Sequence, residues 1–280
     1  MPIKQNYFHC YVTANDIWHY KADLKNLLRI KNCKHGLDKV NLLIAISQAK
    51  KLRFTDQLFK YLVKLLFINH KSVKLKTVFF KSNEGRDFSS YSACLNKILE
   101  KGIEDGFCFF QNRSGYGPFM ENWYAKFIDQ INKFPMAVLC GSTINFRDHP
   151  MRSTKINLPH VQTYAFLAKI KAIKSVLSDL KAISQSTRLD MILNGEIQLS
   201  QKILNNGNSI TCMEWPDAEV TASSQAIERF DVRGKLKNKH QFYHKGLFHK
   251  KRSILDMLAE SVQLVIVIFL NLIGFRVMPR

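Results

Sequence analysis

The sequence predicts an α/β protein built on a mixed, mostly parallel sheet flanked by helices. Short apolar runs of strand length alternate along the chain with segments whose apolar residues recur at helical spacing, an alternation typical of β–α–β units. The 280 residues suffice for one large domain or two small ones, and 46% hydrophobic and 23% charged residues are ordinary globular values. These figures exclude a disordered chain, a collagen-like fibre and a multi-pass membrane protein.

The first part of the chain combines helices and strands. Helices are expected over residues 22–31 and 55–68, where apolar residues such as Leu58, Leu62 and Leu65 recur every three or four positions. Residues 41–46 have strand length, although a helix is not excluded there. A further strand ends at Phe80, and a helix is expected over residues 89–101.

The second part repeats this order. Residues 107–110 form a continuous apolar run, as expected of a strand covered on both faces. The elements expected after it are a helix over 119–133, a strand over 137–140, an irregular polar stretch over 142–159, a strand over 162–167, helices over 169–183 and 195–206, and a last strand over 210–213. The Asn205-Asn206-Gly207 sequence predicts the end of the second of these helices.

Charge restricts the partners. The chain has 42 Lys and Arg against 22 Asp and Glu, a net charge of +20, so its partners are expected to be anionic: nucleic acid, an acidic membrane or a phosphorylated small molecule. The six cysteines are scattered without paired spacing, which predicts reduced, buried residues. The N-terminus has no apolar run of secretory length, so a cytoplasmic location is expected.

Polar loops after the predicted strands are the candidate site, because ligands of such sheets bind beyond the carboxyl ends of the strands. In the loop 83–87, Gly85 permits a tight turn, Arg86 could pair with a phosphate and Asp87 could accept a hydrogen bond from a ribose hydroxyl. Alternatively, this loop is an ordinary connection in which Asp87 caps the next helix. In the loop 112–118, Arg113 and two glycines suit an anion, or the glycines serve only a turn.

Two further loops supply a histidine and a carboxylate. His160 lies beside a predicted strand start, where it could contact a diphosphate or a metal, or it is a structural residue. Glu196 is predicted to open a helix, whose dipole would favour the ionised form, so that it could act as a general base on an acceptor hydroxyl. The alternative is that Glu196 only stabilises the helix start.

Taken together, these loops resemble a known family. The stretches that carry the resemblance, in matching order over about residues 75–215, are FFKSNEGRDFSSY, FCFFQNRSGYGP, the following Trp123-Tyr124, LCGSTINF, LPHVQTYAFL and NGEIQLSQKILNNG. They are similar to bacterial glycosyltransferase-like proteins of lipopolysaccharide, capsule and rhamnan synthesis. The resemblance implies a GT-A-like fold and transfer of a sugar from a nucleotide-sugar to a saccharide or lipid-linked acceptor.

The resemblance also implies roles for particular residues. The residues that would bind the donor are Asn83, Gly85, Arg86, Asp87, Asn112, Ser114, His160 and Gln162. Glu196 would be the catalytic base, and Arg113 would be the second catalytic residue.

The sequence departs from the family pattern at the strand end where many GT-A enzymes place an Asp-x-Asp metal motif. Asn112, Arg113 and Ser114 stand there instead, without a carboxylate, whereas a hard cation such as Mg²⁺ or Mn²⁺ prefers anionic oxygen ligands. Either Arg113 neutralises the leaving diphosphate, or Asp87 and His160 hold a metal elsewhere. The first, metal-independent alternative is favoured.

The C-terminal part has a different composition. Residues 1–228 are expected to form the transferase-like domain, and residues 229–280 a basic and apolar segment with nine Lys and Arg against one acid over 229–252. The uncharged residues 261–275 would make a helix of roughly 22 Å, shorter than a hydrocarbon core of about 30 Å. The segment is therefore expected to bind an anionic membrane surface peripherally, although burial of 261–275 in the core is the alternative.

Two other functions stay open. The +20 charge, with aromatic residues among basic ones, also suits a nucleic-acid-binding protein, but no known binding motif is present and nucleic acid is not the expected partner. A non-catalytic glycosyltransferase-fold partner of a polysaccharide assembly is the third possibility, because Asp-x-Asp is missing.

Overall fold

The computed structural model describes residues 5–17, 20–153, 155–184, 187–224, 240–248 and 253–279. The helices are α1 (Lys21–Asn32), α2 (Phe54–Phe67), α3 (Arg86–Leu99), α4 (Trp123–Asn132), α5 (Ile170–Ser178), α6 (Arg188–Met191), α7 (Gln198–Asn205) and α8 (Ile254–Leu272), with short helical segments η1 (Lys181–Ser184), η2 (Ile192–Ile197) and η3 (Lys245–Phe248). The strands are β1 (Tyr7–Ala14), β2 (Val40–Gln48), β3 (Val73–Ser82), β4 (Phe107–Asn112), β5 (Gly115–Tyr116), β6 (Ala137–Gly141), β7 (Ile144–Arg147), β8 (Asn157–Val161), β9 (Ala165–Lys169), β10 (Ser209–Cys212), β11 (Glu219–Val220) and β12 (Tyr243–His244).

An eight-stranded sheet forms the centre, in the order β11-β10-β6-β9-β4-β1-β2-β3. Strands β3, β2, β1 and β4 are parallel neighbours, and so are β6 and β10. Strand β9 runs antiparallel between β4 and β6, and β11 is an antiparallel edge strand. The prediction of a mixed, mostly parallel sheet is confirmed.

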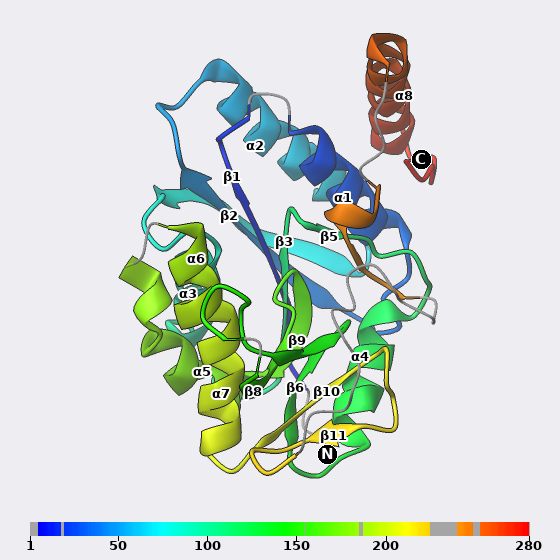
Figure 1. The fold of residues 1–280 in the computed structure, drawn as a ribbon. Helices are drawn as coiled ribbons and strands as arrows, with labels where there is room; N and C mark the ends of the chain where they lie inside the picture. The colour runs from blue at the N-terminus through cyan, green and yellow to red at the C-terminus, as the bar shows by residue number, and fades with distance from the viewer. Residues whose placement is uncertain are drawn as a thin grey trace.

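Helices cover both faces of this sheet (Figure 1). Alternate side chains of β1 point to opposite faces, as a strand requires: Cys10 and Val12 pack with α3, α5 and α7, whereas Tyr11 packs with α1 and α2. Helix α4 covers a third cluster around Phe109. Burying each large apolar side chain contributes roughly 1.5–3 kcal/mol, so these clusters fix the strand order and the edge where the strands end.

Most predicted elements are confirmed, with shifts of a few residues at their ends. The alternative of a helix over 41–46 is wrong, because these residues lie in β2, between β1 and β3. The predicted helix 119–133 begins only at Trp123, because Asn122 has a φ of 58° and the backbone N–H of Phe119 bonds to Gln241. All six cysteines are buried and unpaired, as predicted.

Several strands were not predicted. Strand β1, at the centre of the sheet, contains His9 and Thr13 and lacks the long apolar run of β4. Residues 142–159, predicted as irregular, contain strand β7 and the first residues of β8, which pair as a hairpin. Strand β10 is not the last strand, since β11 and β12 follow it.

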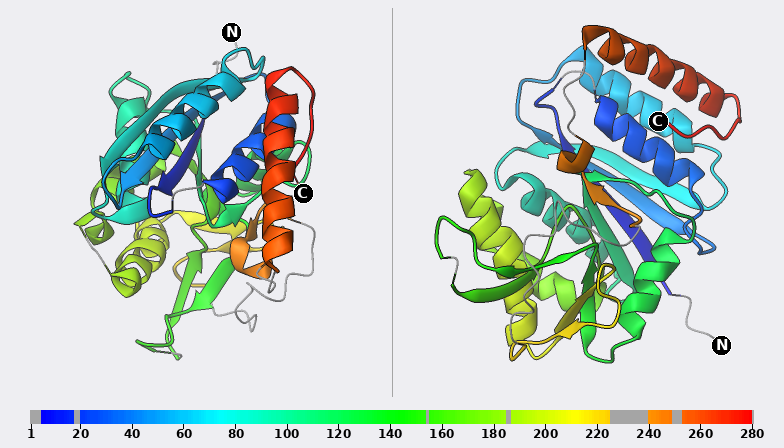
Figure 2. Two further views of the ribbon diagram at one scale, coloured as in Figure 1. Left: turned by 90° about the horizontal axis from the view of Figure 1, so that it is seen from above. Right: turned by 45° about the vertical axis from the view of Figure 1, so that its right-hand side comes forward.

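The C-terminal helix α8 lies beside α1 and α2 in both views of Figure 2. It begins at Ser253, whose side chain and that of Asp256 cap each other's backbone N–H groups. With 19 residues it is about 28 Å long, longer than the sequence predicted. Among the described residues, Leu255–Leu272 is the one stretch long and apolar enough to cross a bilayer, and 17% of it is buried. Residues 229–239 and 249–252 of the basic segment lie outside the described residues.

Candidate functional site

A cavity of about 540 Å³ opens at the carboxyl ends of β1, β2, β3 and β4. It brings together eight of the ten residues predicted for the site: Asn83, Arg86, Asp87, Asn112, Arg113, Ser114, Gln162 and Glu196. Gly85 and His160 are not in its wall. The cavity therefore joins the polar loops that follow neighbouring strands, where the fold places ligands.

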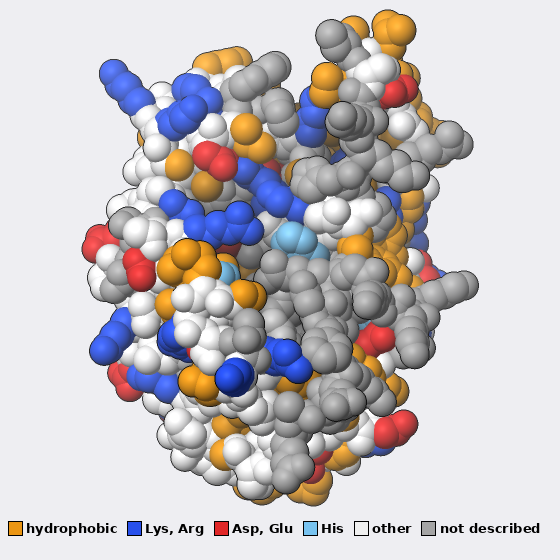
Figure 3. Space-filling model, in the orientation of Figure 1, with side chains coloured by type: hydrophobic (Ala, Val, Ile, Leu, Met, Phe, Trp, Pro, Cys, Tyr) orange, Lys and Arg blue, Asp and Glu red, His pale blue; other side chains and the backbone are white. Residues whose placement is uncertain are grey.

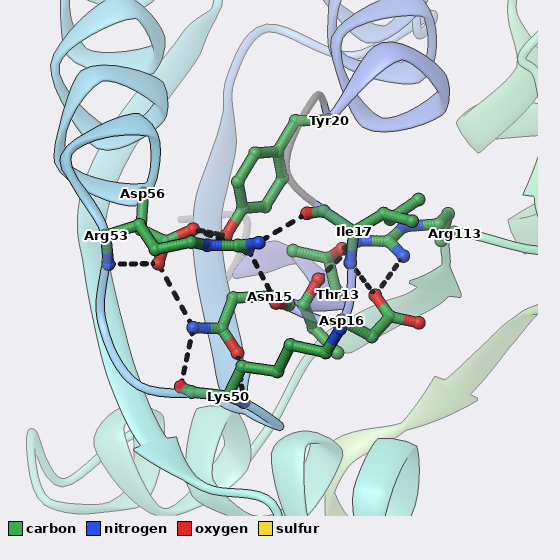
Figure 4. A network of polar contacts seen from close by, with 10 residues as sticks. Thr13, Asn15, Asp16, Ile17, Tyr20, Lys50, Arg53, Asp56 and Arg113 are labelled. Carbon is green, nitrogen blue, oxygen red and sulfur yellow. Dashed lines mark hydrogen bonds and ion pairs between the residues drawn. The ribbon is translucent and has the colours of Figure 1, made fainter.

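Arg113 lies in the cavity wall, but its guanidinium is already paired. Its Nη1 donates to Asp16 at 2.5 Å (Figure 4). Its Nε donates to Asp23 at 2.9 Å, and its Nη2 donates to the Thr13 hydroxyl at 2.7 Å and to the Ala14 carbonyl. Burial opposes the charge, but the two carboxylates outweigh it and raise the pKa of Arg113. Asp23, with a side chain that is 0% exposed, depends on this cation, because burial raises the pKa of its carboxyl. These contacts give Arg113 a structural role, and its predicted role at a leaving diphosphate stays a prediction.

A second network holds the loop after β1, next to Arg113. Asp56 of α2 accepts hydrogen bonds from Asn15, at 3.1 Å, and from Tyr20, at 2.9 Å (Figure 4). Arg53 donates to the carbonyls of Asn15 and Ile17. These contacts fix the wall of the cavity on the β1 side.

Asp87 and Asn112 meet across the cavity wall. The Asn112 Nδ2 donates to Asp87 Oδ2 at 2.9 Å, while its Oδ1 accepts from the N–H groups of Ser114 and Gly115. Burial raises the pKa of Asp87, and Asn112, Arg113, Arg86 and Lys245 offset part of that rise. Asp87 is thus a carboxyl surrounded by donors and cations.

Glu196 does not open a helix as predicted. It lies in the π-helical segment η2, inside a continuous helical stretch from Arg188 to Asn205. Its Oε2 accepts from the backbone N–H of Thr163 at 3.1 Å and from the Thr163 hydroxyl at 2.9 Å, and its Oε1 accepts from Gln162 at 3.0 Å. Hydrogen bonds from β-sheet loops, and not a helix terminus, therefore hold this carboxylate, whose side chain is 12% exposed. π-Helical turns are frequent at functional sites.

His160 lies behind Glu196. Its Nδ1 bonds to the carbonyl of Leu158 at 2.7 Å, and its Nε2 lies 3.9 Å from Glu196 Oε1. Gln162, which follows in the loop after β8, reaches the cavity. The structure thus brings Gln162 and Glu196 together at the cavity and leaves His160 in the layer beneath.

The glycines of the predicted loops serve the protein's own backbone. Gly85 has a φ of 63° and precedes α3, so it makes the turn that brings Asp87 to the cavity. A Cβ on Gly115 would lie 2.2 Å from the Tyr164 carbonyl, because β5 approaches the start of β9 closely there. The interpretation of this second loop as a glycine-lined approach to a ligand is not supported.

Three other cations line the same cavity. The side chains of Arg86, Arg188 and Lys245 are exposed and make no hydrogen bond or ion pair with any residue in the described ranges. Lys245 reaches the site because β12 pairs with β5 and the Lys245 N–H bonds to the Ser114 carbonyl at 2.7 Å. Figure 3 shows Lys and Arg side chains gathered over the middle of this face.

Sequence reasoning missed Arg188 and Lys245, and also Asp16 and Ser47 at the ends of β1 and β2. Arg188 could have been found from its place ahead of Glu196 on one helical stretch. Nothing in the sequence indicates that Lys245 pairs across more than a hundred residues with the loop after β4.

The donor set of the cavity does not fit a divalent cation held by protein alone. No group of three His, Cys, Asp or Glu suited to a metal occurs in the part of the chain that the structure describes. Asp16 Oδ1 is paired with Arg113 and Asp87 Oδ2 with Asn112, so one oxygen of each carboxylate is engaged within the protein. We derive no reaction step through a metal.

Comparisons with known proteins show similarity of structure only. No family model matches the chain, and no curated protein matches it. A solved 4-diphosphocytidyl-2C-methyl-D-erythritol synthase is 12% identical with a TM-score of 0.44, over 79% of this chain and 94% of that chain. A mannosyltransferase from Pyrobaculum calidifontis in complex with GDP-Man and Mn²⁺ is 12% identical with a TM-score of 0.45, over 75% of this chain and 55% of that chain. At this level of similarity neither structure assigns a function to the chain.

Proposed function

We propose that this chain is a glycosyltransferase that moves a sugar from a nucleotide-sugar donor to a saccharide or lipid-linked acceptor in bacterial surface polysaccharide synthesis. The observation that carries the proposal is the cavity at the strand ends, where three cations that make no hydrogen bond or ion pair within the described residues lie in the same wall as a positioned carboxylate. The family resemblance of residues 75–215 supports the same function.

At the donor end, Arg86, Arg188 and Lys245 bind the diphosphate. As the bond between the sugar's anomeric carbon and the phosphate oxygen breaks, its electron pair stays on the diphosphate, and the cations stabilise the added charge. Because these side chains make no hydrogen bond or ion pair in the part of the chain that the structure describes, they can do this without breaking any contact seen there. Asp87 accepts hydrogen bonds from a donor hydroxyl in this proposal, and Asn83, Asn112 and Ser114 line the nucleotide.

At the acceptor end, Glu196 is the general base. The acceptor oxygen forms the new bond to the anomeric carbon while its proton passes to Glu196. Thr163 and Gln162 hold both carboxylate oxygens, so the carboxylate is oriented before the acceptor arrives.

Arg113 is a positioning residue in this proposal. Its contacts with Thr13, Asp16 and Asp23 tie the end of β4 to the end of β1 and to α1. It shapes the cavity wall, while the three unpaired cations meet the phosphate groups.

A cytoplasmic location at the inner face of the membrane belongs to the same proposal. A lipid-linked acceptor is presented from the bilayer, so the enzyme would act at its surface.

The test is turnover. We expect the purified chain to release a nucleoside diphosphate from at least one nucleotide-sugar when a lipid-linked saccharide acceptor is present, and to retain activity with a chelator. Glu196→Gln should bind the donor and not transfer the sugar, whereas Glu104→Gln, outside the cavity, should behave as the unaltered protein.

Two outcomes would instead favour the other functions. Binding of nucleotides without turnover, with every acceptor tried, would identify a non-catalytic partner. The absence of carboxylates at Asn112, Arg113 and Ser114 is the observation that favours this alternative. Steeply salt-dependent binding of oligonucleotides without any nucleotide-sugar binding would identify a nucleic-acid-binding protein.

A further inference from the structure

Apolar side chains are concentrated on one side of the molecule. Of the twenty large apolar side chains that are strongly exposed among the described residues, sixteen lie within 52–68 and 255–278, which are α2, α8 and the residues next to them. Soluble monomers rarely expose apolar patches of this extent without a partner.

Eight of these sixteen side chains form a stripe along α8 and the residue after it. Its members recur every three or four residues or are adjacent, so they share one side of the helix: Leu255, Leu258, Val262, Val265, Ile266, Phe269, Leu272 and Ile273. On the opposite side, Leu264, Val267 and Asn271 are buried against the rest of the protein. The packing of α8 therefore leaves its most continuous apolar stripe facing outward.

Helix α2 adds a second stripe. Phe54, Leu58 and Tyr61 are 80%, 42% and 59% exposed and lie on one side of α2, and Ile68 follows just beyond its end. Helix α8 touches α2, and both views of Figure 2 show the two helices close together. We call these two stripes together the α2–α8 face.

Polar contacts hold α8 along the protein surface. Near its start, Glu260 pairs with Lys25 and Ser261 accepts from Lys21. Near its end, Asn271 accepts from Lys31 and Asn32, both at 2.8 Å. These contacts along the length of α1 show that α1 and α8 run in the same direction. If α8 left α1 to cross a bilayer, Glu260 and Asn271 would enter the hydrocarbon without these partners.

Charge selects the kind of partner. Residues 20–80, which include α1 and α2, contain fourteen Lys and Arg, of which Lys25 and Arg29 are buried, against three Asp, of which Asp23 and Asp56 are buried. An apolar stripe with a basic surround matches the interfacial region of an anionic bilayer, where apolar side chains enter the acyl boundary and basic ones meet the headgroups.

We infer that the α2–α8 face docks onto an anionic lipid bilayer, with α8 lying in the plane of the membrane surface. Because α1 starts at the end of the sheet where the cavity opens, and α8 runs in the same direction, the start of α8 lies at that end. The docked face thereby brings the cavity to the bilayer surface, which, on the proposed function, is where a lipid-linked acceptor would be held. The first part of this inference stands without the proposed function, and the second part rests on it.

The test uses the full chain and sedimentation with vesicles of phosphatidylcholine, with and without phosphatidylglycerol. We expect binding to the anionic vesicles and weaker binding to the neutral ones. Val265→Glu with Phe269→Glu should weaken binding at least about tenfold, and Phe54→Glu with Leu58→Glu by a smaller factor. The matched control, Met136→Glu with Met151→Glu, places the same charges on exposed apolar residues away from the face and should bind as the unaltered protein does. All these side chains are exposed, so melting temperatures should stay close to that of the unaltered protein.

Several results would overturn the inference. One is absence of binding to both kinds of vesicle, and another is equal binding by the unaltered protein and the Val265→Glu, Phe269→Glu variant. A lipid-free dimer that this variant dissociates, with no vesicle binding, would show that the face is a contact between two copies of the chain. Resistance to alkaline extraction from membranes would show that α8 crosses the bilayer. Each of these can occur while nucleoside diphosphate binding is normal, so failure here is distinct from failure of the proposed function.

Discussion

The cavity wall carries two kinds of cation that look alike in the sequence and differ in the structure. At the end of β4, Arg113 contacts Asp16 and Asp23, and 12% of its side chain is exposed. Elsewhere in the wall, Arg188 and Lys245 are exposed and contact no carboxylate among the described residues. A paired, buried cation stabilises the fold, whereas an unpaired one at the mouth of a cavity is available to an anion. The number of basic residues near a strand end therefore does not identify the anion site. The site is identified by which of these residues lack a carboxylate partner in the part of the protein that the structure describes.

The largest expected effect is on stability, at Arg113. Arg113→Ala leaves the buried Asp23 carboxylate without its cation, so the free energy of unfolding should fall by about 3–5 kcal/mol in urea denaturation. Adding Asp23→Asn should restore part of the loss, because a neutral amide needs no counter-ion. Arg188→Ala should change stability by less than about 0.5 kcal/mol. Equal effects of Arg113→Ala and Arg188→Ala would contradict the contrast between these two cations.

The next effect is on turnover, at Glu196. Glu196→Gln keeps the shape of the side chain and removes the base, so the transfer rate should fall at least about 100-fold while donor affinity is unchanged. The measurement is single-turnover sugar transfer beside donor titration. A rate within a few-fold of the unaltered enzyme would remove Glu196 from the mechanism.

A smaller effect is expected for the single cations Lys245 and Arg188. Lys245→Gln and Arg188→Gln should each weaken nucleoside diphosphate binding by roughly tenfold, since each removes one charge-assisted contact. Fluorescence titration at fixed ionic strength measures this. Lys171→Gln, an exposed lysine outside the cavity, is the control for general charge, and an equal loss there would point to nonspecific attraction.

The smallest expected effect is on the pH dependence of stability, through the buried His9. Burial lowers the pKa of His9 from 6.5 to about 3, so the folded protein keeps it neutral while the unfolded chain takes up a proton below about pH 6.5. The stability that the neutral His9 side chain contributes is fully present above the pKa that His9 has in the unfolded chain. It is lost, by roughly 1 kcal/mol per pH unit, as the pH falls from 6.5 towards 3. His9→Leu should therefore lose less stability than the unaltered protein between pH 7 and pH 5. His149→Leu is the control, and parallel curves for His9→Leu and the unaltered protein would contradict the assignment.

The elements that depend on the local sequence pattern were predicted correctly. The strand at Phe107–Phe110 and the helix at 55–68 follow from apolar spacing alone, and the site loops follow from the rule that parallel strands end at one edge. Strand β1 was missed because its central place comes from pairing with β2 and β4, 30 to 100 residues away, and not from its own composition.

The site shows the same division. Its location could be predicted, because Asn83, Asp87 and Asn112 stand directly after strands. The state of its side chains could not, because the partners of Arg113 are 90 and 97 residues away and Lys245 arrives through a two-residue strand pair. Glu196 was placed at a helix start because the sequence gives no sign that a π-helical turn continues the helix through it.

The central claim is that the strand-end cavity binds the diphosphate of a nucleotide-sugar through Arg86, Arg188 and Lys245. The most direct measurement is calorimetric titration of a panel of nucleoside diphosphates into the unaltered protein, into the Arg86→Gln, Arg188→Gln, Lys245→Gln variant, and into a Lys101→Gln, Lys171→Gln, Lys181→Gln variant with the same net charge. The account predicts one saturable binding event for at least one nucleotide, lost in the first variant and kept in the second. Binding that survives in the first variant, or binding of no nucleotide by the unaltered protein, would contradict it.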